Sequence, residues 1–246
     1  MKVLVTGSEG SIGRVVVRGL AAAGHSVRGL DFENRTDGQR ELITGSITDP
    51  DDVARAMKGM DTVIHLAAVP DDADFIDVLL EPNVVGPYRI FEGAVKAGVQ
   101  RVVVASSIQV SSPWDSEGES IRVEDTPFLN NHYALTKLWV EDMALFYSQR
   151  RNLSTIAVRI GWFPRELRNI EDNPLLSVLT NWYLSQRDAA EFFKRCVESD
   201  QPAPGESAVL FAVGKQQHAP FFDLSLSESI IGYTPRDTFP ENLTFG

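Results

Sequence analysis

The segment TGSEGSIG, residues 6–13, follows a short apolar run and precedes small and apolar residues at helical spacing over 12–23. Its glycines, Gly7, Gly10 and Gly13, are three residues apart, whereas the dinucleotide-binding fingerprint has spacings of two and three. The variant meets the same physical needs: a tight turn, a backbone that approaches a pyrophosphate, and a helix packed closely on a strand. The start of that helix would then present unpaired N–H groups to an anion.

Strand-like and helix-like segments alternate from this motif outward. The expected strands are 2–6, 26–30, 41–44, 62–65, 101–105 and 155–160. The expected helices are 12–23, 51–57, 83–97 and 132–149. Because the strands lack polar alternation, both faces of their sheet should be covered by helices. The pattern predicts an α/β fold, a Rossmann-type doubly wound parallel sheet with a small C-terminal substrate lobe.

The pattern becomes irregular after residue 160. We expect residues 1–160 to form an NAD-binding Rossmann domain and 161–246 a small substrate-binding lobe that partly returns to the sheet, both within one compact unit. A helix is expected over 188–197 and a strand over 209–213. Residues 111–130, rich in Ser, Pro, Glu and Asp, are expected to form a loop.

Composition excludes several classes of function. The 246 residues are 43% hydrophobic and 23% charged, which is typical of a globular protein. With 34 acidic and 23 basic residues, the net charge of −11 argues against nucleic acid or an anionic membrane as a partner. One cysteine, Cys196, excludes an internal disulfide framework and a multi-thiolate metal site, and we expect no metal. Without a leader pattern or a membrane-length apolar stretch, the expected location is the cytoplasm.

Asp31 ends the second expected strand, shortly after the glycine motif. A carboxylate at this place accepts hydrogen bonds from the adenosine ribose and repels a 2′-phosphate, which favours NAD over NADP. Arg14 and Arg35 lie nearby in the sequence and could serve a 2′-phosphate instead, so acceptance of NADP stays open.

Tyr133 and Lys137 stand four residues apart at the start of a long expected helix. Side chains at this spacing share one helix face, and a neighbouring positive charge favours the phenolate. We therefore expect Lys137 to lower the pKa of Tyr133 and Tyr133 to act as a general acid and base. Ser107 follows the strand 101–105, at the edge of the sheet where a cofactor crevice should open.

Together these motifs resemble the extended short-chain dehydrogenase/reductase family, in its sugar epimerase/dehydratase branch. The matching residues are the glycine motif, His65-Leu66-Ala67-Ala68, Asn83, Ser107 and the Tyr133/Lys137 pair. The resemblance spans essentially the whole chain. It implies that Lys137 binds the nicotinamide ribose and that Ser107 hydrogen-bonds the reacting oxygen. The residues that it implies for NAD are Gly7, Gly10, Ser11, Ile12, Gly13, Asp31, Ser46, Ile47, Leu66, Ala67, Ala68, Asn83, Tyr133 and Lys137.

Two of these assignments have alternatives. Asn83 could equally be a structural polar group that bridges a helix and a strand. Ser46 stands where the family often has an aspartate that contacts adenine, and the nearby Asp49 is expected to cap the following helix instead.

Only the residues after 160 are left to form a substrate lobe, and this small lobe indicates a small substrate. Four further stretches match one group within the family: 105–107 (ASS), 158–161 (VRIG), the region 179–182, and 232–235 (GYTP). In these stretches the chain resembles the uronate dehydrogenases, which oxidise the anomeric carbon of a hexuronate. It departs from them in having Ile108-Gln109 in place of Asn-His, and in the spacing of Arg165 and Arg168, which could bind a carboxylate or be solvated loop charges. The residues expected at the substrate are Ser107, Gln109, Trp162, Arg165 and Arg168.

The sequence thus predicts an NAD-dependent dehydrogenase of a small sugar or sugar acid. A sugar epimerase that retains its NAD is one alternative. A non-catalytic NAD(P)-binding sensor is another, although the presence of both Tyr133 and Lys137 argues against it. A homodimer is expected because helix 132–149 is broadly apolar and family members often pair through it and helix 83–97; burial of that surface within one chain is the alternative.

Overall fold

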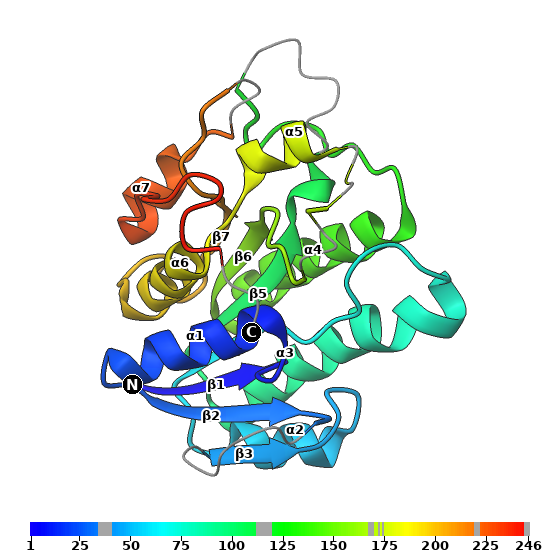
Figure 1. Ribbon diagram of the computed structural model, residues 1–246. Helices are drawn as coiled ribbons and strands as arrows, with labels where there is room; N and C mark the ends of the chain where they lie inside the picture. Colours follow the sequence, from blue (N-terminus) through cyan, green and yellow to red (C-terminus); the bar gives the residue numbers. More distant parts are fainter. Residues whose placement is uncertain are drawn as a thin grey trace.

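A computed structural model of the chain describes residues 1–33, 41–111, 120–166, 170–171, 173, 175–218 and 222–243 (Figure 1). In these residues seven parallel strands form one sheet, in the order β3-β2-β1-β4-β5-β6-β7. The strands are β1 (Lys2–Thr6), β2 (Ser26–Asp31), β3 (Glu41–Thr44), β4 (Thr62–His65), β5 (Arg101–Ser107), β6 (Ser154–Ile160) and β7 (Ser207–Ala212). The order reverses between β1 and β4, so the predicted Rossmann-type doubly wound sheet is confirmed.

Helices lie on both faces of the sheet (Figure 1). One apolar cluster joins the sheet to α1 (Ser11–Ala22) and α6 (Gln186–Glu198). The other joins it to α2 (Pro50–Met57), α3 (Gly86–Ala97) and α4 (His132–Arg151). Burial from both sides explains the run of valines in β5, where Val102, Val103 and Val104 are all inaccessible to solvent. No helix among the described residues is long and apolar enough to cross a membrane.

The structure adds short helices that the sequence did not predict. Two π-helical turns, η1 (Phe75–Leu79) and η2 (Glu81–Val85), precede α3. The others are the 3₁₀ turns η3 (Ile108–Val110) and η6 (Thr180–Trp182), and the helices α5 (Leu176–Leu179) and α7 (Ser225–Ile231). The predicted cap of α2 is confirmed, since the Asp49 side chain accepts from the N–H groups of Asp51 and Asp52.

The C-terminal part contributes both to the sheet and to a separate apolar cluster. β7 pairs with β6, and α6 packs against α1. Beyond the end of β5 a third cluster forms from Ile108, Ile121, Trp182, Phe211, Val213 and Phe222. This cluster supports the segments that enclose the carboxyl end of the sheet, while the domain division at residue 160 stays a prediction.

Candidate active site

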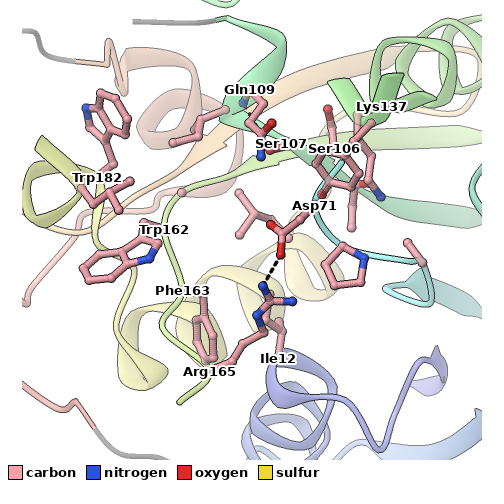
Figure 2. Close-up of a pocket in the computed structure, with 18 of the residues that line it drawn as sticks. Ile12, Asp71, Ser106, Ser107, Gln109, Lys137, Trp162, Phe163, Arg165 and Trp182 are labelled. Carbon is pink, nitrogen blue, oxygen red and sulfur yellow. Dashed lines mark hydrogen bonds and ion pairs between the residues drawn. The ribbon is translucent and has the colours of Figure 1, made fainter. Parts of the chain in front are cut away.

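A cavity of about 480 Å³ opens at the carboxyl ends of β4, β5 and β6 (Figure 2). It brings together residues predicted for catalysis and substrate binding: Ser107, Gln109, Tyr133, Lys137, Trp162 and Arg165. Residues predicted for the cofactor also line it, namely Ile12, Leu66 and Ala68. Arg168 and Arg35 lie outside the described residues.

The glycine turn has the geometry that a diphosphate requires. Gly7 has φ +68°, and a Cβ there would lie 2.7 Å from the backbone nitrogen of Ala67. A Cβ on Gly13 would overlap the carbonyl oxygen of Gly7. Within the described residues, α1 starts with neither a side-chain cap at Gly10 nor an acid in its first turn, so its N–H groups, beginning at Ser11, suit an anion. These residues therefore fit the diphosphate of a dinucleotide.

Asp31 lies where the adenosine end of such a cofactor is expected. Its carboxylate accepts from the N–H of Glu9 at 2.8 Å and of Glu33 at 3.3 Å, which ties the glycine turn to β2. Ser46 bonds through its hydroxyl to Thr48 at 2.8 Å. Contacts of Ser46, and of the buried Ile47 beside it, with adenine stay predictions.

Ser107 at the end of β5 and Tyr133 at the start of α4 line the same cavity, and their side chains are close enough for Ser107 to influence the pKa of Tyr133. Burial and, second to it, the negative charge of Asp71 raise the pKa of Tyr133 to about 12. Ser107 and the charge of Arg165 act in the opposite direction. The prediction of a lowered pKa is therefore wrong for this state of the protein, because burial outweighs the favourable neighbours.

Lys137 lies beside Tyr133 as its spacing predicted. Its Nζ is 5.4 Å from the centre of the Tyr133 ring and donates to the carbonyl oxygen of Ala105 at 3.1 Å. Burial lowers the pKa of Lys137 to about 8. Burial and the Lys137 charge also lower the pKa of His65 to about 3, so His65 is neutral, and its Nδ1 lies 2.7 Å from the hydroxyl of Thr6. His65 is therefore a neutral side chain packed at the strand end.

A buried ionic network lies next to Ser107. Glu141 receives two hydrogen bonds from Arg159, at 2.9 and 2.8 Å, and one from the hydroxyl of Ser106 at 2.5 Å. Arg159 also donates to the hydroxyl of Ser111 at 2.8 Å. The network joins β5, β6 and α4, and it reaches the residue next to Ser107 through Ser106. Sequence reasoning missed it, although Glu141 stands four residues after Lys137 and so shares its helix face.

Asn83 serves the loop after β4. Its side chain accepts from the N–H of Val69 at 2.8 Å and donates to the carbonyl of Val69 at 2.9 Å, and only 1% of the residue is exposed. These contacts favour the structural alternative over a contact with the cofactor. In the same loop, Asp72 accepts from the N–H groups of His132 and Tyr133 at the start of α4. The loop thereby helps to position Tyr133.

Aromatic and amide side chains form the wall beyond Ser107 (Figure 2). Trp162 lines the cavity as predicted, and Phe163 and Trp182 line it as well. Arg165 forms an ion pair with Asp71, a residue that sequence reasoning did not single out. The guanidinium of Arg165 is therefore paired with a carboxylate of the chain itself, that of Asp71.

Comparison with known proteins shows what the chain is similar to. The pattern of the NAD dependent epimerase/dehydratase family matches residues 3–162. L-arabinose 1-dehydrogenase (NAD(P)(+)) of Haloferax volcanii is 30% identical, over 96% of each chain. Uronate dehydrogenase of Pseudomonas putida is 26% identical, over 96% of this chain and 84% of that one. A solved structure of a mutated uronate dehydrogenase superposes with a TM-score of 0.79 at 26% identity, over 96% of this chain and 82% of that one.

Proposed function

The chain belongs to the NAD dependent epimerase/dehydratase family, and we propose that it is an NAD-dependent dehydrogenase of a small sugar or sugar acid. One observation carries the proposal: Ser107, Tyr133 and Lys137 lie together in one cavity at the carboxyl edge of the sheet, with Lys137 beside the Tyr133 ring. The names of the relatives, which oxidise sugars and uronates, support the same reaction class.

The residues divide into a group that holds NAD and a group that handles the substrate. The glycine turn and the start of α1 would hold the diphosphate, and Asp31 the adenosine ribose. When bound, NAD supplies the acceptor for a hydride. Ser107 and Tyr133 would orient the substrate hydroxyl, and Tyr133 would take up its proton. The ammonium of Lys137, present below about pH 8, favours the phenolate that this step requires.

Purified protein with NAD and a panel of aldoses and uronates tests the proposal, with reduced nicotinamide followed by absorbance. We expect net NADH with at least one of these sugars. Tyr133→Phe should lower turnover by about 10²–10⁴-fold and leave NAD binding unchanged. Tyr88→Phe, on an exposed residue of α3, is the matched control and should keep full activity. An unchanged rate in Tyr133→Phe would refute the mechanism, and sugar interconversion without net NADH would favour an epimerase.

We also propose a homodimer that pairs through α3 and α4. Tyr88 on α3 and Leu145 and Phe146 on α4 are 46, 46 and 52% exposed, which is unusual for large apolar side chains on neighbouring helices. Light scattering at micromolar concentration should give twice the chain mass, and a mass of one chain would contradict pairing. The cytoplasmic location stays a prediction from the sequence.

A further inference from the structure

The wall of the cavity around Ser107 is built from uncharged hydrogen-bonding groups. The side-chain nitrogen of Asn131 donates to Gln109 Oε1 and to Asn130 Oδ1, both at 2.9 Å. Gln109 and Asn130 both line the cavity, as does Trp162 (Figure 2 shows Gln109 and Trp162). Because Asn131 holds the oxygen of Gln109, the amide nitrogen of Gln109 is a donor for a ligand oxygen. Amide groups and an indole are the partners that a sugar with hydroxyl groups requires.

Two charged residues of opposite sign meet across this cavity. Asp71, from the loop after β4, is paired with Arg165, from the segment after β6 (Figure 2). Both charges influence the proton affinity of Tyr133, so the pair lies near the reacting position. Asp71 has φ +66°, a left-handed conformation that Asp and Asn adopt more readily than most residues. The backbone at this position is therefore compatible with either of these two side chains.

The pair determines how the cavity receives a charged ligand. Among the described residues that line it, the cations are Lys137 and Arg165. Lys137 is held beside Tyr133 by the carbonyl of Ala105, and Arg165 is held by Asp71. A substrate carboxylate would have to share Arg165 with Asp71 and would meet the negative charge of Asp71. A neutral sugar avoids this repulsion, since its hydroxyl groups can donate to Asp71 and accept from Arg165.

Resting on the proposed function, we propose that this enzyme takes an uncharged aldose in preference to a uronate, and that Asp71 sets this preference. Asp71 acts by neutralising Arg165 and by repelling an anionic substituent. The sequence resemblance placed Arg165 as a possible clamp for a carboxylate; in the structure its ion pair with Asp71 leaves a site suited to hydroxyl groups.

A matched series of sugars tests this preference. D-galactose and D-galacturonate differ only at C6, which is CH₂OH in one and a carboxylate in the other, and L-arabinose has the same ring stereochemistry without that carbon. We expect a higher kcat/KM, at saturating NAD, for D-galactose or L-arabinose than for D-galacturonate. In Asp71→Asn the ratio of kcat/KM for the uronate to that for galactose should rise by about fivefold, the range of an exposed ion pair.

Two further variants separate the role of Asp71 from a general effect of charge or folding. Asp77→Asn removes an equal charge from an exposed residue on η1, which does not line the cavity, and should leave the ratio unchanged. Arg165→Gln should move the ratio in the opposite direction to Asp71→Asn, because Asp71 is then unopposed.

The outcomes distinguish this inference from the proposed function. A higher kcat/KM for D-galacturonate than for D-galactose would overturn the preference while leaving the dehydrogenase intact. An unchanged ratio in a folded Asp71→Asn protein would overturn the role of Asp71. If NAD binds and none of the three sugars, nor any in the wider panel, gives NADH, the proposed function fails and this inference fails with it.

Discussion

Replacing Glu141 by Gln tests the network next to Ser107. The side chains of Arg159 and Glu141 are 3% and 6% exposed, so this ion pair has almost no access to water. The amide would leave the guanidinium of Arg159 without its charged partner, and would remove an acceptor that Arg159 and Ser106 share. Breaking one side of a buried ion pair costs about 3–5 kcal/mol, because an uncompensated charge stays buried.

The expected loss is measurable by two methods. For a chain of this size 1 kcal/mol corresponds to about 2–4 °C, so the midpoint of thermal unfolding should fall by about 6–20 °C. Unfolding in urea, followed by tryptophan fluorescence, gives the same loss as a free energy. Because Ser106 directly precedes Ser107, turnover should fall as well at temperatures where the variant is folded.

Two controls make the result specific. Glu41→Gln disrupts an exposed ion pair with Arg28, in which the Glu41 side chain is 57% exposed, and should cost about 0–1 kcal/mol. The double variant Glu141→Gln/Arg159→Met removes both charges and should recover most of the lost stability. The reasoning is refuted if Glu141→Gln costs no more than Glu41→Gln, or if the double variant is less stable than the single one.

Two other substitutions test the cofactor turn and the buried lysine. Gly13→Ala introduces a Cβ that overlaps the carbonyl oxygen of Gly7, so NAD binding measured by equilibrium dialysis should be lost. In Gly24→Ala the new Cβ has nothing within 4 Å; its φ of +86° costs stability, but the folded variant should retain NAD binding. Equal affinities in the two variants would contradict the assigned turn. Between about pH 8 and its ordinary pKa of 10.5, Lys137 binds a proton in the unfolded chain and not in the folded one, so its contribution to stability rises with pH across this range. Lys137→Met should remove that rise in urea unfolding measured from pH 7 to 10, and an identical slope in both proteins would count against the lowered pKa.

The fold was predictable because its signals are local. Each strand of a parallel sheet is buried on both faces, so it is a short apolar run that stands out between helices. The glycine motif and the cap at Asp49 are also readable over a few residues, and both agree with the structure. The π-helical turn over 75–79 was not predicted, and of the turn over 81–85 only residues 83–85 fell within the expected helix 83–97. Apolar residues fill most of this segment and Pro82 interrupts it, so it shows no clear helical period.

The meeting of Ser107, Tyr133 and Lys137 was predictable for a related reason. The carboxyl ends of parallel strands share one edge of the sheet, so a polar residue at the end of β5 and the start of α4 are expected at the same edge. The pairing of Arg165 with Asp71 follows no such rule. The two residues belong to different loops, and their meeting depends on the path of each loop beyond the sheet.

The pKa of Tyr133 shows where local reasoning fails. Four-residue spacing correctly placed an ammonium beside the phenol, and that argument alone predicts a lowered pKa. Tyr133 and Lys137 are also shielded from bulk water at this site, and burial disfavours the charged form of each side chain. Asp71 adds a negative charge from a distant part of the sequence. The chemistry of the site therefore depends on the balance between burial and charge, which only the three-dimensional arrangement provides.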